Sequence, residues 1–326
     1  MKKVYFLLPD RVLRPGSLFS AIEVLEQANT YYTSRGRKPY YDIKIIGFNS
    51  GQSILNSRFF IKTDNISLRR ARPDVIIIPG IHDLNSNSLN KNKNLLSWMI
   101  ERYKDGCELA SLCTGSFMLA ATGLLNNEEC STHWAAEKSF MEMFPKVKLC
   151  TDKIITDSKG IYTAGGANSS LNLILYLIEK FNGRETAVYC SKILMIDINR
   201  SSQAPFVLFE GQKNHVDKDI LRVQKFIEAN VEEKISVEEL AGKFNISRRS
   251  FVRRFKKATN NSPLEYMQRI KIEAAKRYLE RGRLNINEVM YSLGYSDVKA
   301  FRGMFRKITG ISPINYRNKY NKEAMV

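Results

Sequence analysis

Residues 251–266 read FVRRFKKATNNSPLEY, and residues 301–316 read FRGMFRKITGISPINY. The two stretches are offset by 50 residues and are identical at seven of their 16 positions, which hold Phe, Phe, Lys, Thr, Ser, Pro and Tyr in that order. An internal repeat of this kind predicts two copies of one structural unit. Because Phe251 and Phe255 would share one face of a helix, the repeated unit is predicted to be helical.

The first copy has the sequence pattern of a helix-turn-helix unit. Ser236 and Glu239 form a predicted capping box that opens a short helix. After a tight turn, Ser247 is expected to cap a second helix over residues 248–259. A Ser-Pro pair ends the unit, and Pro263 suits the first position of the following helix.

The second copy repeats this pattern. Asn285 and Glu288 supply the capping box, and Gly294 allows the turn between the two helices. Ser296 is expected to cap the second helix, over residues 297–309. The sequence therefore predicts two helix-turn-helix units in an all-α C-terminal domain.

Positive charge gathers on the second helix of the first copy. Residues 243–257 hold seven basic side chains and no acidic one. Arg249 and Arg253 would share a face that can enter a DNA major groove, where the guanidinium group fits a guanine edge. The neighbouring basic side chains better suit phosphates: Arg254, Lys256 and Lys257. The alternative, a charged helix that merely faces solvent, explains the tandem arrangement less well.

Residues from about 220 to 320 resemble the DNA-binding domain of AraC/XylS-type transcriptional regulators. The stretch GYSDVKAFRGMFRKITGISPINYR, at residues 294–317, matches the signature of that family nearly throughout. The resemblance implies two helix-turn-helix units joined by a long helix, here at about 263–281, and binding to double-stranded DNA. The sequence departs from the family at Gly303, where Arg is common, and a glycine inside a helix costs about 1 kcal/mol relative to alanine.

The resemblance also implies which residues contact DNA. By position, the base-contacting places of the family fall on Arg249, Val252, Arg253, Lys299, Ala300, Arg302 and Gly303. With the basic neighbours of these positions, the predicted DNA-binding residues are Arg248, Arg249, Val252, Arg253, Arg254, Lys256, Lys299, Ala300, Arg302 and Arg306.

The net charge of the chain agrees with a nucleic-acid partner for this region. Of the total of +18, residues 1–212 contribute +6 from 26 basic and 20 acidic side chains. Residues 213–326 contribute +12, from 25 basic and 13 acidic side chains. A positive surplus favours an anionic partner, and most of the surplus lies in the predicted helical domain.

The length of 326 residues and the near-average composition predict two globular domains. The five cysteines are odd in number and form no C-x-x-C pair, which favours a reducing cytosol and a cytoplasmic location. Two uncharged stretches, at 109–127 and 160–178, raise the question of a membrane span. Because both contain Gly, Ser and Thr, they suit buried helices better, and no membrane partner is expected.

The first 200 residues alternate strand-like and helical patterns. Strands are expected at 4–8, 42–48, 75–79 and 108–113, helices at 18–32, 95–103, 115–122 and 167–181, and a strand and hairpin region at 147–163. This alternation predicts a doubly wound, flavodoxin-like α/β domain with a parallel sheet. We therefore expect an α/β domain at 1–199, a linker at 200–217 and the helical domain at 218–326.

Cys113 is expected at a junction between a strand and a helix. Free N–H groups at a helix N-terminus lower the pKa of a thiol and can stabilise an oxyanion. His133 could act as a base, and the backbone of Gly80 could line the same site. The alternative is that Cys113 is a small buried packing residue.

Metal and cofactor sites receive little support from the sequence. Cys130 and His133 have helical spacing for two metal ligands, but no second pair of ligands accompanies them. The chain has no P-loop and no G-x-G-x-x-G fingerprint. We expect no metal and no cofactor.

Residues of about 3–195 resemble the ThiJ/PfpI superfamily, also described as class I glutamine amidotransferase-like. The resemblance rests mainly on ASLCTGSFMLAATGLL, at 110–125, and STHW, at 131–134. It implies a doubly wound sheet with a cysteine at the nucleophile elbow. Active members, including isonitrile hydratases, also carry an acidic residue that aligns with Ser17 here.

The missing carboxylate at position 17 predicts that this domain is not an enzyme. The residues expected to line its ligand site are Ser17, Gly80, Cys113, Thr114 and His133.

The order of the two domains resembles that of GlxA-type regulators. That resemblance implies an N-terminal domain that binds a small metabolite, forms a homodimer and controls DNA binding. It allows a nitrogenous effector and a contact with RNA polymerase. Two alternatives stay open: a Cys113-dependent hydrolase or hydratase with an appended DNA-binding domain, and a non-specific nucleoid or membrane-surface binder.

Overall fold

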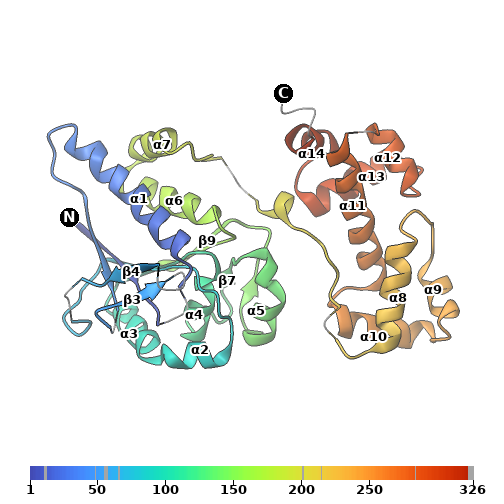
Figure 1. Cartoon of the computed structure of the whole chain (residues 1–326), viewed down its shortest axis with the longest axis horizontal. Helices are drawn as coiled ribbons and strands as arrows, with labels where there is room; N and C mark the ends of the chain where they lie inside the picture. The colour runs from blue at the N-terminus through green and yellow to red at the C-terminus, as the bar shows by residue number, and fades with distance from the viewer. Residues whose placement is uncertain are drawn as a thin grey trace. The chain divides into compact units, whose positions relative to one another are not determined.

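The chain divides into two compact units, residues 1–203 and residues 204–326 (Figure 1). The computed structural model describes residues 1–10, 13–47, 49–54, 58–64, 67–199, 202–213, 215–282 and 284–321. The predicted strand end at Phe48, the start of the predicted linker at 200–201 and the last five residues lie outside the described residues.

A six-stranded sheet forms the centre of the first unit, in the order β2-β1-β5-β6-β10-β9. Its strands are β1 (Lys2–Leu7), β2 (Tyr41–Ile46), β5 (Val75–Ile78), β6 (Glu108–Ser111), β9 (Ile155–Ser158) and β10 (Ile161–Ala164). All neighbours pair in parallel except β9, which runs antiparallel to β10 at the edge. Two short pairs lie outside this sheet: β3 (Gly51–Ile54) with β4 (Phe59–Lys62), and β7 (Glu129–Cys130) with β8 (Lys148–Leu149).

Helices cover both faces of the sheet (Figure 1). One face packs on α1 (Pro15–Thr33), α6 (Ser169–Asn182) and α7 (Arg184–Ile193), and the other on α2 (Ser86–Lys91), α3 (Lys93–Lys104), α4 (Ser116–Ala121) and α5 (Glu137–Met143). Side chains alternate along β1, so that Val4 and Phe6 enter the first core while Tyr5 and Leu7 enter the second. The doubly wound, flavodoxin-like fold predicted from the sequence is confirmed.

The second unit is helical, with two separate cores. Its helices are α8 (Lys218–Ala229), α9 (Val237–Lys243), α10 (Arg248–Thr259), α11 (Pro263–Arg281), α12 (Ile286–Ser292), α13 (Val298–Thr309) and α14 (Pro313–Tyr320). The first core gathers on Phe251, Phe255 and Tyr266, and the second on Phe301, Phe305 and Tyr316. Because α11 contributes residues to both cores, it joins the two helix-turn-helix units as predicted.

The helix caps agree with the sequence in part. The capping boxes of Ser236 with Glu239 and of Asn285 with Glu288 are present. Ser247 stands at the N-cap of α10, but its side chain makes no capping hydrogen bond. Ser296 does not cap α13, because the carboxylate of Asp297, one residue later, accepts the backbone N–H groups of Lys299 and Ala300. A carboxylate is a favourable acceptor at the positive end of a helix.

The segment predicted as a linker is divided between the two units after Gln203. Gln203 is buried in the first unit, whereas Pro205 and Phe209 are buried in the second. The part of the segment up to Gln203 therefore packs within the first unit, and the part from Ala204 onward packs within the second. None of the described helices is long and apolar enough to span a membrane.

Candidate functional site

Cys113 lies at a sharp turn between β6 and α4. Its φ of +55° is in the left-handed region, and the turn Cys113–Gly115 leads directly into α4. A Cβ atom at Gly115 would stand 2.5 Å from the carbonyl oxygen of Ile78, so only glycine allows this close approach. The strand-turn-helix junction predicted around Cys113 is therefore present.

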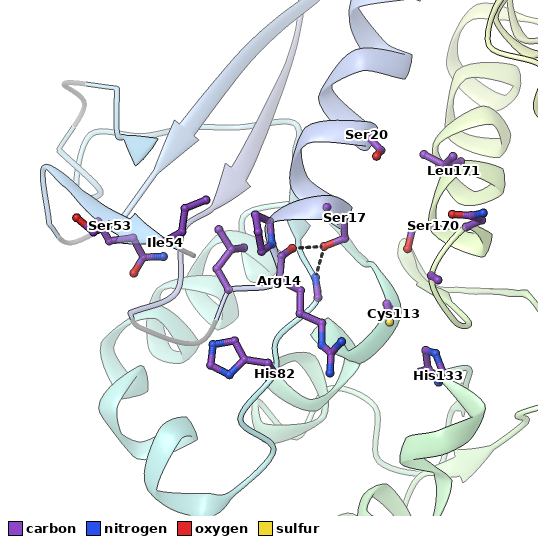
Figure 2. Close-up of a pocket in the computed structure, with 17 residues that line it drawn as sticks. Arg14, Ser17, Ser20, Ser53, Ile54, His82, Cys113, His133, Ser170 and Leu171 are labelled. Carbon is purple, nitrogen blue, oxygen red and sulfur yellow. Dashed lines mark hydrogen bonds between the residues drawn. The ribbon is translucent and has the colours of Figure 1, made fainter. Parts of the chain in front are cut away.

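A cavity of about 820 Å³ opens beside Cys113 (Figure 2). Its described lining residues come from the start of α1, the β3 strand, the loop after β5, the Cys113 turn, the His133 loop and the start of α6. Four of the five predicted ligand residues line it: Ser17, Gly80, Cys113 and His133. Thr114 is not among the lining residues, because its hydroxyl is buried and bridges the backbone of Ile81, donating to the carbonyl at 2.5 Å and accepting the N–H at 3.0 Å.

The Ser17 hydroxyl accepts a backbone N–H group that an oxyanion hole would need free. Its Oγ accepts the N–H of Gly80 at 2.8 Å and donates to the carbonyl of Arg14 at 2.9 Å (Figure 2). The Gly80 N–H is thus engaged inside the protein instead of pointing unpaired into the cavity. An oxyanion hole depends on free donors of this kind.

His133 is held as a neutral ring with a fixed orientation. Burial lowers the pKa of its imidazole below the usual value, and the nearby Arg14 guanidinium lowers it further. Nδ1 accepts the N–H of Ala135 at 3.1 Å, and the ring lies against Gly166, where a Cβ would approach within 2.9 Å. No hydrogen bond joins His133 to the Cys113 thiol, both of which are described side chains.

Arg14 supplies a positive group to the cavity that the sequence reasoning missed. Its backbone N–H donates to Gly80 at 2.7 Å, and its Nε donates to the carbonyl of Ile81 at 3.0 Å. The rest of the guanidinium group reaches into the cavity between His82 and His133 (Figure 2). No aspartate or glutamate occurs among the described lining residues, so nothing acidic in the wall neutralises Arg14.

Ser170 is a second lining residue that the sequence reasoning missed. It stands in the first turn of α6 and is only 1% exposed, and its Oγ has no hydrogen-bond partner within the described structure. A buried hydroxyl is normally paired, so a ligand or water group would satisfy it. The described lining thus combines the Arg14 guanidinium group, the unpaired Ser170 hydroxyl and apolar walls from Leu13, Ile54 and Leu171.

The described residues contain no cluster of three or more His, Cys, Asp and Glu side chains that could hold a metal ion. Cys130, one half of the weak Cys-x-x-His pattern, is buried, which raises the pKa of its thiol to about 12. A metal ligand has to be the thiolate, so this environment disfavours a zinc role for Cys130.

The predicted DNA-contacting helix of the first helix-turn-helix unit, α10, presents its basic side chains to solvent. Phe251 and Phe255 are buried on one side of the helix. Five basic residues of the helix are exposed: Arg248, Arg249, Arg253, Lys256 and Lys257. Val252 between them is partly buried. Arg248 also forms an ion pair with the exposed Glu238 at 2.6 Å. Exposed ion pairs contribute little free energy, so a DNA phosphate could replace Glu238 as the partner of Arg248.

Arg254 differs from its basic neighbours. Its guanidinium group binds Asp217 with Nε at 2.9 Å and Nη2 at 2.6 Å, and Asp219 with Nη2 at 2.9 Å. Asp217 is the N-cap of α8, so this ion pair fastens α10 to the start of α8. This ion pair gives Arg254 a structural role, and the phosphate contact predicted for it from the sequence stays a prediction.

The corresponding helix of the second helix-turn-helix unit, α13, is less basic. Lys299, Ala300, Arg302 and Arg306 are exposed on it, as a DNA-contacting surface requires. Gly303 is exposed as well, and a Cβ there would meet no atom within 4 Å. The glycine is therefore not required by packing.

Comparison with known proteins gives matches to both units. Residues 3–180 match the model of the DJ-1/PfpI family, and residues 240–319 match that of a helix-turn-helix domain. The chain is 27% identical over 305 residues to the HTH-type transcriptional regulator GbdR of Pseudomonas aeruginosa, an alignment that covers 92% of this chain and 80% of that protein. It is 25% identical over 217 residues to the HTH-type transcriptional regulator GlxA of Rhizobium meliloti, with 66% of each chain covered.

A solved structure supports the fold of the first unit. A putative transcriptional regulator protein from Vibrio parahaemolyticus superimposes with a TM-score of 0.51 at 22% identity. The superposition covers 59% of this chain and 98% of that one. At this identity the likeness shows the fold alone.

Proposed function

Because the chain belongs to the DJ-1/PfpI family and joins that domain to an AraC-type helix-turn-helix domain, we propose that it is a transcriptional regulator whose N-terminal cavity binds a small effector that controls DNA binding. Relatives with this architecture, GbdR and GlxA, are HTH-type transcriptional regulators, and DNA binding belongs to the matched helical domain. The DNA-contacting surface consists of the exposed residues of α10 and α13, and the effector site is the cavity beside Cys113.

The observation that carries the effector proposal is the environment of Arg14. Within the described structure, the Arg14 guanidinium group donates only its Nε, and no described lining residue of the cavity is acidic. Such a group fits a carboxylate, to which Arg can donate two parallel hydrogen bonds. The apolar walls suit a short carbon skeleton. The effector is therefore a small molecule with a carboxylate group, and a nitrogenous group elsewhere in it is compatible with the neutral His133.

Thermal unfolding with paired ligands tests this proposal. The probes are amino acids and short carboxylic acids, each compared with its uncharged amide. At least one acid is expected to raise the unfolding midpoint of the chain while its amide does not, because a ligand that binds the folded state stabilises it. Arg14→Gln should abolish that rise, whereas the control Arg37→Gln, in the exposed loop after α1, should preserve it. Equal shifts with acid and amide, or an unchanged response in Arg14→Gln, would contradict the proposal.

The cavity is also proposed to bind its ligand without chemistry at Cys113. The Gly80 N–H is engaged by Ser17, no carboxylate stands at position 17, and the thiol is not hydrogen-bonded to His133 in the described structure. Cys113→Ser should therefore retain the effector response. The hydrolase or hydratase alternative predicts turnover of the bound acid or amide, lost in the same variant.

The remaining partners follow from the family resemblance and stay predictions. A homodimer formed through the N-terminal unit, a contact with RNA polymerase and a cytoplasmic location all suit a transcriptional regulator. A dimer would present two copies of the DNA-contacting surface, which matches the two-fold symmetry of many operators.

A further inference from the structure

Gln203, the last residue of the first unit, is fixed behind the wall of the effector cavity. Its side chain is 2% exposed. Nε2 donates to the carbonyl of Thr132 at 2.9 Å, and Oε1 accepts the N–H of Gly166 at 3.0 Å. Its backbone N–H donates to the carbonyl of Asp152 at 3.1 Å, so side chain and backbone are both held.

The two groups that Gln203 joins belong to two different parts of the cavity wall. Thr132 directly precedes His133, and Gly166 directly precedes Ala167, and both of these neighbours line the cavity. Gly165 makes the contact sterically feasible, because a Cβ there would stand 2.7 Å from the Gln203 amide. A ligand that changes the spacing of His133 and Ala167 must therefore change the hydrogen bonds of Gln203.

The residues that follow Gln203 are fastened to the second unit by a buried ion pair. Lys276 of α11 is 3% exposed, and its Nζ donates to the carbonyl of Val207 at 2.6 Å and to Glu273 at 2.8 Å. Glu273 in turn accepts the N–H of Phe209 at 3.3 Å. The buried ammonium group of Lys276 and the carboxylate of Glu273 thus hold the Val207 carbonyl and the Phe209 N–H. Because both charges are removed from water, these hydrogen bonds fix the orientation of the segment.

Aromatic contacts complete this attachment and reach the second helix-turn-helix unit. The short turn Ala204–Phe206 contacts α13. The Phe206 ring lies edge-on to Tyr320 at 6.4 Å, with Lys319 above it at 4.4 Å. Phe209 packs against Tyr266 at 5.3 Å in the first helical core. The segment is therefore attached next to one of the two DNA-contacting helices.

We propose that residues 202–209, here called the strap, carry the effector signal from the cavity wall to the DNA-binding unit, with Gln203 as the positioning residue at one end and Lys276 with Glu273 as the anchor at the other. Only four residue steps separate Gln203 from Val207, and they span at most about 14 Å when extended. The strap is therefore a short connection between its two attachments. This proposal rests on the proposed function, since it needs an effector in the cavity.

The strap works in both directions if it couples the two sites. Binding free energies are reciprocal, so DNA bound to the second unit must change the effector affinity of the cavity by the same factor as the effector changes the DNA affinity. Cys113 reports on the cavity from its lining. Its alkylation by iodoacetamide can be followed by mass spectrometry of its peptide in the intact chain, and this readout does not require the effector to be identified.

A flexible insertion in the strap tests the proposal. A Gly-Ser-Gly-Ser insertion between Gln203 and Ala204 leaves both attachments in place but adds flexible chain between them. The control carries the same four residues between Gly36 and Arg37, in an exposed loop where a Cβ atom on Gly36 would have no neighbour within 4 Å.

The DNA used in the test is selected from a random pool by the intact chain.

The alkylation rate of Cys113 follows the population of cavity conformations that expose the thiol. DNA is expected to shift that population, and with it the rate in the natural chain and in the control, by about fivefold, the lower end of ordinary coupling between two binding sites. The strap insertion should reduce this change to less than about twofold, at unchanged DNA affinity and unfolding midpoint. An insertion variant that responds like the control would overturn the strap, as would a natural chain that binds DNA without any change at Cys113. A chain that selects no DNA would instead refute the proposed function.

Gln203→Ala provides an independent arm. It removes both side-chain hydrogen bonds to the cavity wall and leaves the chain length unchanged. We expect the DNA-dependent change at Cys113 to be lost in this variant as well, while DNA affinity is retained. Retention of the full change would show that Gln203 is a packing residue only.

Discussion

Arg253 and Arg254 are neighbours in α10, but their guanidinium groups have different surroundings. Arg254 is paired with Asp217 and Asp219, whereas Arg253 is exposed and has no ion pair within the described structure. Adjacent positions on a helix point about 100° apart, so one side chain faces α8 and the other faces solvent. The two residues therefore serve as controls for each other.

Arg253→Ala is expected to weaken binding to selected DNA by about 1–3 kcal/mol, with a smaller loss on random DNA. The reason is that a guanidinium group on a base edge contributes sequence-dependent energy, whereas a phosphate contact contributes equally on every sequence. Gel-shift or anisotropy titrations at fixed salt measure both losses. Lys257→Ala, the phosphate-type control, should lose the same amount on both DNAs, and equal losses for Arg253→Ala would reduce it to the same role.

Arg254→Ala is expected to act on stability and to do so in a pH-dependent way. Hydrogen bonds from Arg254 hold the pKa of Asp217 below its ordinary value. A carboxyl group whose pKa is lowered on folding stabilises the protein above that ordinary value and loses this effect as the pH falls through the lowered one. Because the pair is partly exposed and screened by solvent, the loss at pH 7 should be about 1 kcal/mol.

Urea unfolding followed by circular dichroism at pH 7 and at about pH 3 measures this difference. The destabilisation by Arg254→Ala should be present at pH 7 and shrink in acid. Arg253→Ala should leave the free energy of unfolding nearly unchanged at both pH values. A pH-independent loss in Arg254→Ala would mean that its aliphatic packing matters and its charge does not.

Site residues were predictable where a motif fixes the backbone and not where only tertiary structure brings groups together. Cys113 follows from a strand-to-helix junction, and Ser17 from its alignment with the acidic residue of active family members. Arg14 and Ser170 come from the starts of two different helices that meet only after the sheet has formed. Nothing in their local sequence distinguishes them from solvent-exposed residues.

At the level of helices, Gly294 and Gly303 of the second helix-turn-helix unit have opposite roles. Gly294 has a φ of +74°, and a Cβ there would stand 2.9 Å from the carbonyl oxygen of Glu232. Gly303 lies inside α13 with open space around its Cβ position. Only the first is required by the backbone.

Gly303→Ala is therefore expected to stabilise α13 by about 1 kcal/mol, because alanine loses less backbone freedom in a helix. Hydrogen exchange of the α13 amides measures the change locally. Gly294→Ala should instead destabilise the turn between α12 and α13. If Gly303→Ala slows no amide exchange, the helix is not limited by its glycine.

Helix positions were predictable because short-range rules determine them. The capping boxes at Ser236 and Asn285 depend on residues three positions apart, and both are present. The cap of α13 was misplaced by one residue, since Ser296 and Asp297 are both good capping residues and only the observed backbone distinguishes them. Strand neighbours within the sheet are non-local, and the alternating pattern predicts the class of fold but not the strand order.

At the scale of the whole molecule, the repeat and the charge difference predicted two domains, but not how the segment between them behaves. That segment is polar and irregular in sequence, which is typical of a free linker. Two of its aromatic side chains, Phe206 and Phe209, and the buried Lys276 of a distant helix attach it to the second unit. A contact of this kind depends on residues about 70 positions apart, as in the hydrogen bond from Lys276 to Val207.

The intact chain is expected to be a homodimer, and its mass in solution should be about twice 37.5 kDa. Light scattering coupled to size exclusion measures this mass directly. The expectation rests on the family resemblance and on the symmetry of regulator binding sites. A monomer that still bound its DNA tightly would require both helix-turn-helix units of one chain to suffice.

This chain is expected to distinguish its own DNA sites from other sequences. The most direct test compares its affinity for DNA selected from a random pool with its affinity for unselected DNA of the same length, at physiological salt. A specific regulator binds its own sites at least about a thousandfold more tightly than random sequences. Equal affinity for both DNAs, falling together as salt rises, would contradict sequence-specific binding and indicate a non-specific basic protein.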